Sequence, residues 1–314
     1  KIYFCSMPFF MLYNYGAAVL RAVGDTKRPL LFLIISGAIN AVLNLFLVIA
    51  FSMGVAGVAI ATVISQVISC VLVLWCLFTT DSCYRLQISK LGIKGEYLLQ
   101  IFQVGVPAGI QSVVINFSNV LLQSSVNSFG SIAMAGYTAA NKLYGILESA
   151  SVAFGYAMTA YMGQNRGARN AARIDAGIRA VLVLSAEFTA AIVTAMLVAG
   201  KPLLGLFLST EEAGAADALA VAYQYLMVLM AFLFALFMLQ AYRSSLQGLG
   251  EMTVPTLSGF AEMLMRMGAA LVLPTFIGQS GVFFAEGAAW VCAAALNLVW
   301  YYMRIGKIKR DMLK

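Results

Sequence analysis

The sequence consists of long apolar runs separated by short polar segments. A helix that crosses the hydrocarbon core of a bilayer needs about 20 mostly apolar residues. Nine runs meet this requirement, and they lie at approximately 2–20, 30–51, 54–78, 100–128, 131–163, 174–199, 218–246, 253–277 and 281–303. The pattern therefore predicts an all-α fold, a polytopic membrane helix bundle with nine transmembrane helices.

Composition agrees with a membrane location and argues against an enzyme. Of the 314 residues, 62% are hydrophobic and 11% are charged, whereas soluble domains carry about a quarter charged residues. Histidine, the most versatile general base and metal ligand, is absent from the sequence. No close pair of membrane carboxylates is evident either. We therefore expect no catalytic residues, no metal site and no cofactor.

Basic residues concentrate on one side of the predicted bundle. Lys201 is the one basic residue in a loop after an even-numbered span. Fifteen follow odd-numbered spans: Arg21, Lys27, Arg28, Arg85, Lys90, Lys94, Arg166, Arg169, Arg173, Arg243, Arg304, Lys307, Lys309, Arg310 and Lys314. Because basic loops stay in the cytoplasm, we expect a multi-pass protein of the plasma (inner) membrane with a cytoplasmic C-terminus. The asymmetry explains the net charge of +7 without a nucleic-acid partner.

A short motif occurs twice. Residues 20–29 read LRAVGDTKRP, and residues 246–255 read LQGLGEMTVP. Both copies leave one span on the basic side and enter the next, which predicts that spans 1–3 repeat as spans 7–9 about an axis along the membrane normal. Spans 4–6 then lack a counterpart, so we expect the chain to be a fragment of a twelve-span protein, preceded by about 120 residues.

Three stretches carry a resemblance to a known family. They are PFFMLYNYGAAVLRAVGDTKRPLLFL at 8–33, GVPAGIQSVVINFSNVLLQSSVNSFG at 105–130 and GQNRGARNAARI at 163–174. On these motifs the chain resembles the multidrug and toxic compound extrusion (MATE) family. The resemblance implies efflux of small amphipathic, often cationic, molecules in exchange for Na⁺ or H⁺, by a monomer embedded in membrane lipid and without a cofactor.

The resemblance also divides the chain into lobes. Residues 1–80 would form part of an N-terminal lobe, with three helices equivalent to the family's helices 4 to 6. Residues 81–96 would be a cytoplasmic linker between the lobes. Residues 97–314 would form a complete C-terminal lobe of six helices, equivalent to helices 7 to 12.

Polar residues follow one face of each of two consecutive spans. They are spaced three or four apart, which places them on one side of a helix. The members are Ser112, Asn116, Asn119, Gln123 and Asn127 on one span and Tyr137, Asn141, Tyr144 and Glu148 on the next. The stripes indicate either a shared aqueous cleft or interhelical hydrogen bonds. By resemblance this region, together with Gln111, lines the substrate cavity.

A second polar group lies in the first three spans. Its members are Asn14, Asn40, Asn44, Thr62 and Gln66. By resemblance they match the cluster that handles the coupling ion in some family members. The position of Asn44 is often Asp in those members, so the carboxylate expected of an ion site is absent from these residues.

Charged residues within the spans suggest two roles. Glu262 and Arg266 are four residues apart, in the favourable order for an ion pair on a helix, and we expect a structural pair. Glu148 lies on a polar stripe and is the candidate substrate-facing acid. The predicted function is a cation-coupled antiporter that exports small molecules by alternating access. The alternatives are a lipid-linked oligosaccharide flippase, which needs a strongly cationic cavity, and a scaffold without transport activity.

Overall fold

The computed structural model describes residues 2–82, 84–90, 92, 94–208 and 214–313. Throughout this part of the chain the regular structure is helical, and no strand occurs. The chain divides into a smaller unit, Lys1–Lys94, and a larger unit, Gly95–Lys314. The division falls within the predicted linker at 81–96.

The smaller unit contains three long helices, α1 (Met7–Ala22), α2 (Lys27–Leu45) and α3 (Gly54–Thr79). Short helical turns, η1 (Ile2–Ser6) and η3 (Ile88–Lys90), precede and follow them. The end of α2 continues as a π-helix, η2 (Phe46–Ala50). A small apolar core, which includes Tyr13, Leu20 and Val73, joins these helices.

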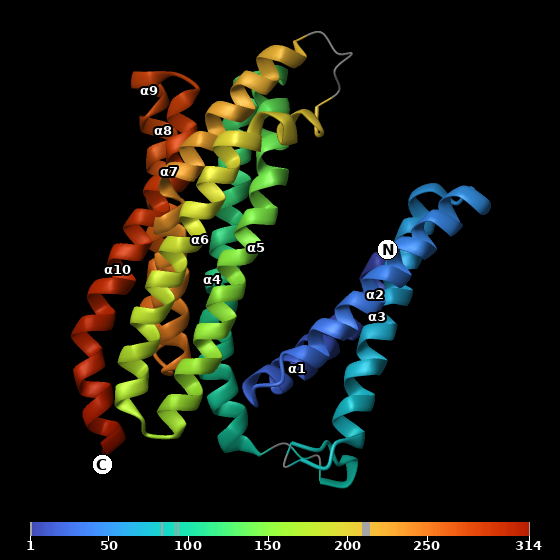
Figure 1. The fold of residues 1–314 in the computed structure, drawn as a ribbon, viewed down its shortest axis with the longest axis vertical. Coiled ribbons are helices and arrows are strands. Elements are labelled where there is room, and N and C mark those ends of the chain that lie inside the picture. The colour runs from blue at the N-terminus through green and yellow to red at the C-terminus, as the bar shows by residue number, and fades with distance from the viewer. Residues whose placement is uncertain (1, 83, 91, 93, 209–213, 314) are drawn as a thin grey trace. The chain divides into compact units, whose positions relative to one another are not determined.

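The larger unit is a bundle of six long helices (Figure 1). They are α4 (Gly95–Asn127), α5 (Ser131–Gly167), α6 (Ala171–Gly205), α7 (Ala215–Gly248), α8 (Thr253–Val272) and α10 (Ser280–Leu313). The short helix α9 (Pro274–Ile277) lies between α8 and α10. α7 is the central helix: it packs against α5, α6 and α10, whereas α8 packs against α10 and α4.

Length and hydropathy agree with a polytopic membrane bundle. Seven of the described helices are long and apolar enough to cross a bilayer. The two remaining predicted spans also coincide with helices, but α1 has only 16 residues, and α5 carries one of the polar stripes along its length. The predicted all-α polytopic fold is thus confirmed.

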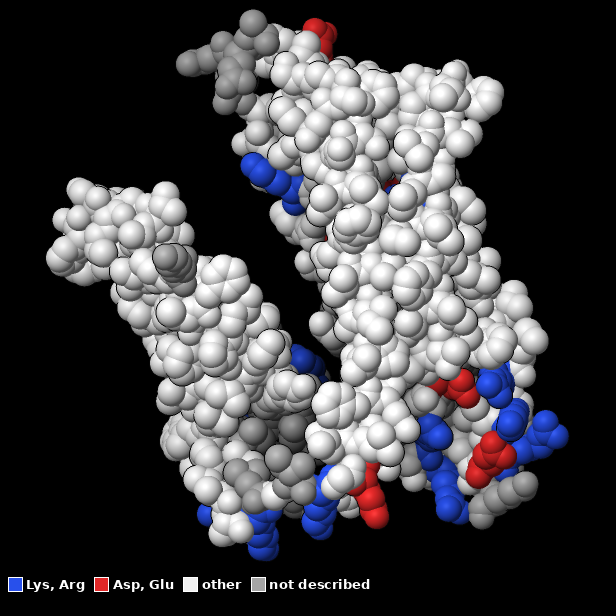
Figure 2. All heavy atoms as spheres, turned by 180° about the vertical axis from the view of Figure 1, so that it is seen from behind, with Lys and Arg blue, Asp and Glu red and all other residues white. Residues whose placement is uncertain are grey.

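Charges gather at one end of the larger unit. On the face shown in Figure 2, Lys and Arg side chains cluster at the end of this unit that carries the C-terminus, and most of the surface between its two ends is uncharged. Basic residues occur in the last turns of α5 and α10, at Arg166 and Arg310. Lys314, one of the fifteen basic residues of the predicted cytoplasmic side, lies outside the described residues.

Candidate functional site

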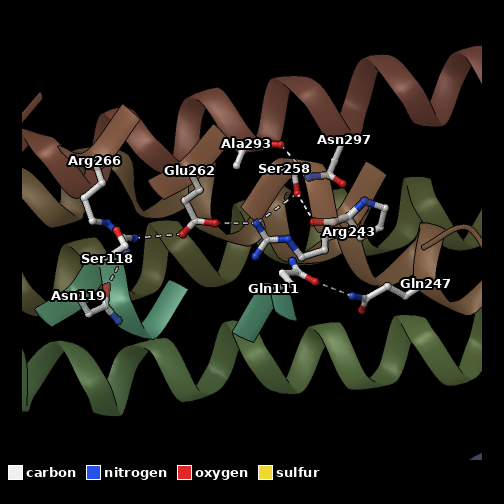
Figure 3. A network of polar contacts seen from close by, with 11 residues as sticks. Gln111, Ser118, Asn119, Arg243, Gln247, Ser258, Glu262, Arg266, Ala293 and Asn297 are labelled. Carbon is white, nitrogen blue, oxygen red and sulfur yellow. Dashed lines mark hydrogen bonds and ion pairs between the residues drawn. The ribbon is translucent and has the colours of Figure 1, made fainter. Parts of the chain in front are cut away.

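A buried network of charges joins α4, α7 and α8 (Figure 3). Glu262 of α8 lies between two guanidinium groups: its Oε2 is 2.6 Å from Nη2 of Arg243, and its Oε1 is 3.0 Å from Nη2 of Arg266. All three side chains are at least 92% buried. Buried charges are tolerated only when they are paired and hydrogen-bonded, and here one carboxylate serves two cations.

Arg243 corrects one sequence-based expectation. Its position near the end of α7 suggested a residue of the cytoplasmic surface. The structure instead buries it against Glu262, where it also donates to the hydroxyl of Ser258 at 3.4 Å. The predicted Glu262–Arg266 contact is therefore part of a triad whose third member the sequence did not reveal.

The network continues onto α4. Nη1 of Arg266 donates to Oδ1 of Asn119 at 2.6 Å and to Oγ of Ser118 at 3.2 Å. Closer to the basic end of the bundle, Gln247 Nε2 donates to Oε1 of Gln111 at 3.3 Å. Gln111 and Ser118 lie on the buried face of α4, which leaves Asn119 as the member of the predicted stripe that reaches the charged network.

The rest of the α4 stripe faces outward within the larger unit. Ser112, Asn116 and Asn127 are exposed, and Gln123 is half-buried. Asn116 donates to the carbonyl of Ser112 at 2.8 Å, and Gln123 donates to Asn127 at 2.9 Å, so these side chains bond along their own helix. The stripe is a continuous polar strip on the surface of this unit.

The α5 stripe faces inward along most of its length. Tyr137 and Tyr144 are buried, whereas Asn141 and Glu148 are half-buried. The hydroxyl of Tyr144 interacts with the Glu148 carboxylate, and Arg266, Glu262 and Glu286 act on it electrostatically. Glu148 has no basic partner within ion-pair distance among the described residues. It is thus an acid at the border of a buried polar core.

A second buried acid lies close to this stripe. Glu286 of α10 accepts a hydrogen bond from the Tyr225 hydroxyl at 2.7 Å, and that hydroxyl also lies 3.3 Å from Oδ1 of Asn141. Tyr225 stacks on Tyr137 with a ring separation of 4.8 Å. Glu286 and Tyr225 are not part of either polar stripe, because they come from two other helices that meet α5 only in the folded bundle.

Five ionisable side chains therefore form one electrostatic group. The guanidinium groups of Arg243 and Arg266 supply two positive charges, and the carboxyl groups of Glu148, Glu262 and Glu286 supply three negative ones. Ion pairs join Glu262 to Arg243 and Arg266. Glu148 and Glu286 interact electrostatically with Arg266 without forming an ion pair with it. With every group ionised, the set has one excess negative charge, which a cation or a proton would neutralise.

The predicted ion-coupling residues lie in the smaller unit, and the structure brings two of them together. Asn44 donates to Asn40 at 3.1 Å, and Asn40 donates to Ser65 of α3 at 3.3 Å. Asn14 and Thr62 bond to carbonyls of their own helices. Gln66 is half-buried, and no side-chain hydrogen bond is described for it. Oδ1 of Asn44 is buried without a described partner, a free acceptor beside the start of the π-helix.

Two family models match the chain. The MatE model matches residues 107–272, and the model of the lipid II flippase MurJ matches residues 1–125. Among curated proteins, the chain is 29% identical to "Probable multidrug resistance protein YpnP" of Bacillus subtilis, over 98% of this chain and 68% of that protein. It is 24% identical to "Multidrug export protein MepA" of Staphylococcus aureus, over 97% of this chain and 66% of that protein.

Solved structures show the same fold. A MATE transporter in the bent conformation covers 96% of this chain with a TM-score of 0.85 and 21% identity, and 67% of that protein is matched. An outward-facing multidrug resistance MATE transporter covers 95% of this chain with a TM-score of 0.87 and 22% identity, and 66% of that protein is matched. The chain thus spans about two thirds of the length of the proteins that it resembles.

Proposed function

The chain belongs to the multidrug and toxic compound extrusion (MATE) family, and from this membership we propose that it is an efflux transporter of small amphipathic molecules, often cationic, which it exchanges for Na⁺ or H⁺ by alternating access. The relatives named as multidrug resistance and export proteins support efflux as the function. The proposal assigns no chemical reaction to the chain: substrate moves across the membrane unchanged.

The position of Glu148 supports a cationic substrate. Glu148 is a half-buried acid on a stripe of tyrosine and amide side chains within a membrane bundle. An unpaired carboxylate in hydrocarbon costs several kcal/mol, so its position is best explained by contact with water or with a positively charged ligand. The neighbouring Tyr144 supplies a hydroxyl that interacts with this carboxylate.

The outward polar strip of α4 supplies a second set of polar groups, and Asn119 links it to Arg266, which acts electrostatically on Glu148. Ser112, Asn116, Gln123 and Asn127 supply uncharged donors and acceptors that satisfy many different ligands without fixing one geometry. Uncharged groups of this kind suit a transporter with several substrates. A protein discriminates strongly between ligands only where its buried polar groups need a hydrogen-bond partner on the ligand. We assign these residues, with Gln111 and Asn119, to the substrate cavity.

For the coupling ion we assign Asn14, Asn40, Asn44, Thr62 and Gln66 to a polar cluster of the smaller unit. The free oxygen of Asn44 supports this assignment. Amide and hydroxyl oxygens are ligands for hard cations, and π-helical segments occur frequently at functional sites. We also infer that the basic end of the larger unit faces the cytoplasm, since basic residues follow the positive-inside rule.

A lipid-linked flippase is the second candidate, because the MurJ model matches residues 1–125. Its cargo carries a pyrophosphate, which needs accessible cations. In the larger unit, however, Arg243 and Arg266 are buried and already bound to Glu262. The excess charge of the buried group is negative, which favours a cationic substrate over an anionic one.

The test is export of ethidium, a cationic dye, by cells that produce the intact protein. Glu148→Gln should reduce ethidium export about tenfold, because it removes roughly 1.4 kcal/mol or more of charge attraction in a partly dry site. Protein abundance should remain normal. Asp311→Asn, which alters an exposed acid near the end of α10 and outside the predicted spans, is the matched control and should export normally.

Unchanged ethidium export by Glu148→Gln would refute the role of this acid. Absence of export by the unaltered protein, together with transfer of a fluorescent lipid-linked saccharide across vesicles, would instead favour the flippase.

A further inference from the structure

Glu286 is a buried acid of the larger unit without an ion-pair partner. Its side chain is 93% buried, as its exposed fraction of 7% shows. No basic side chain lies within ion-pair distance of it in the described part of the chain. Arg266, the cation that acts on it most strongly, already directs both terminal nitrogens to Glu262, Ser118 and Asn119. The negative charge of an ionised Glu286 is therefore not neutralised by a direct partner.

The contacts of Glu286 suit a proton better than a metal ion. One hydroxyl, that of Tyr225, reaches the carboxylate, and the ring of Phe283 packs 5.0 Å from that of Tyr225. Hard metal cations require several oxygen ligands at once. No group of three or more acidic or cysteine side chains that could hold a metal is found among the described residues.

The hydrogen bonds around Tyr225 accommodate both protonation states. When Glu286 is ionised, the single hydroxyl proton of Tyr225 goes to the carboxylate, at 2.7 Å. When Glu286 carries a proton, its own O–H can donate to the Tyr225 oxygen, and the hydroxyl proton is then free to turn to Oδ1 of Asn141, at 3.3 Å. The proton can thus be gained or lost without leaving either hydroxyl or carboxyl group unpaired.

The surrounding charges connect this acid to Glu148. The groups that act on Glu286 are Arg266 and Glu262 of α8 and Tyr225 of α7. On α5, Tyr137, Tyr144 and Glu148 interact electrostatically with it. Because the whole group has one excess negative charge, a proton on Glu286 would remove the charge that attracts a cation to Glu148.

We propose that Glu286, held by Tyr225, is a proton-binding site of the larger unit, and that its proton and a cationic substrate near Glu148 exclude each other. The inference rests on the proposed function and deepens it, since it adds a proton site in the larger unit to the polar cluster assigned in the smaller one. Arrival of a monovalent cation expels one proton, so the exchange transfers no net charge across the membrane.

The experiment measures ethidium binding and proton release together, on the intact purified protein in Na⁺-free, weakly buffered detergent solution. The unaltered protein should release about one proton per ethidium bound, because linkage makes the two affinities reciprocal. Its ethidium affinity should rise about tenfold per pH unit through the range in which the site titrates.

Glu286→Gln mimics the protonated site. It should bind ethidium with the affinity that the unaltered protein has at low pH, release no proton and show no pH dependence. Glu148→Gln should bind ethidium more weakly but keep a pH-dependent proton release, since Glu286 remains. Asp311→Asn is the neutral control and should behave like the unaltered protein.

A second variant covers the case in which Glu286→Gln does not fold. Tyr225→Phe keeps the stacked ring but removes the donor that stabilises the ionised carboxylate, so proton release should move to higher pH. A purely structural role of Tyr225 would change the yield and leave the pH midpoint where it was.

Three results would overturn the proton site at Glu286. Proton release by Glu286→Gln equal to that of the unaltered protein would overturn the inference while the proposed function stands. So would a strict requirement for Na⁺, or an unmoved pH midpoint in Tyr225→Phe. If the unaltered protein neither binds nor exports ethidium, the proposed function fails, and the inference fails with it.

Discussion

At the scale of single residues, the larger unit depends on one carboxylate. Glu262 accepts hydrogen bonds from both Arg243 and Arg266, so its loss would leave two guanidinium groups in an apolar interior. Removing one partner of a buried pair destabilises a protein by about 3–5 kcal/mol, because the remaining charge is uncompensated. Glu262 therefore has more effect on stability than any acid at the surface.

We predict that Glu262→Gln lowers the midpoint of thermal unfolding of the detergent-solubilised protein strongly, by an amount equivalent to about 3 kcal/mol or more. The measurement is the fraction of monodisperse protein that survives heating. Asp311→Asn, at the exposed C-terminal end of α10, should leave the midpoint unchanged. Equal midpoints for the two variants would show that the network adds little to stability.

The same residues show what a sequence can reveal about a site. The contact between Glu262 and Arg266 could be predicted from the sequence, because a spacing of four places both residues on one side of one helix. Arg243 and Glu286 could not, since their partners lie on other helices and the rotation of each helix is set by packing. The stripes on α4 and α5 were visible, but which of them faces inward was not.

At the scale of elements, close contact between α5 and α7 shapes the bundle. Gly136 of α5 lies so near α7 that an added Cβ would be 2.6 Å from the carbonyl oxygen of Ala218. At the other end of the same crossing, a Cβ on Gly248 would be 2.5 Å from the carbonyl oxygen of Thr159. Small residues let membrane helices pack closely, and packing is what holds such helices together.

We predict opposite effects of two glycine substitutions on α5. Gly136→Ala should destabilise the protein by about 1–3 kcal/mol, because the helices must separate to admit a methyl group. Gly145→Ala, on the same helix, meets no atom within 4 Å. It should be neutral or stabilising by up to about 1 kcal/mol, since alanine favours helix. Thermal stability in detergent measures both, and equal behaviour would contradict the packing argument.

Helix number was predictable from the sequence, but helix ends were less so. The apolar run at 281–303 belongs to a helix that extends to Leu313, because polar residues outside the bilayer continue the helix without an apolar signal. The run at 253–277 is divided between α8 and α9 at Pro274, where proline removes a backbone donor.

The repeated motif was informative at the level of local geometry. Gly24 and Gly250 both have a positive φ, 91° and 76°, which suits a helix C-terminus. In each copy the residue after the glycine donates to a carbonyl five positions earlier, from Asp25 to Leu20 and from Glu251 to Leu246. The two turns therefore have the same hydrogen bonds, whereas the repeat of spans 1–3 as spans 7–9 about an axis along the membrane normal stays a prediction.

At the scale of the whole molecule, the distribution of charge along the larger unit defines two ends. The turn between α5 and α6 lies at the same end as the C-terminus, and the turn between α4 and α5 lies at the opposite end (Figure 1). The first turn is rich in arginine, at Arg166, Arg169 and Arg173. A bundle inserted with these residues in the cytoplasm obeys the positive-inside rule.

The last prediction tests this orientation in intact cells. In a variant whose five native cysteines are replaced by serine or alanine, single cysteines are introduced by Ala168→Cys, Gln87→Cys and Ser128→Cys. Ala168 and Ser128 are exposed in the turns at the two ends of the larger unit. A membrane-impermeant maleimide should label Ser128→Cys only, and all three after the cells are permeabilised, because the positive-inside rule holds the arginine-rich turn in the cytoplasm. Labelling of Ala168→Cys or Gln87→Cys in intact cells would contradict the predicted orientation, because it would place that cysteine on the outer side of the membrane.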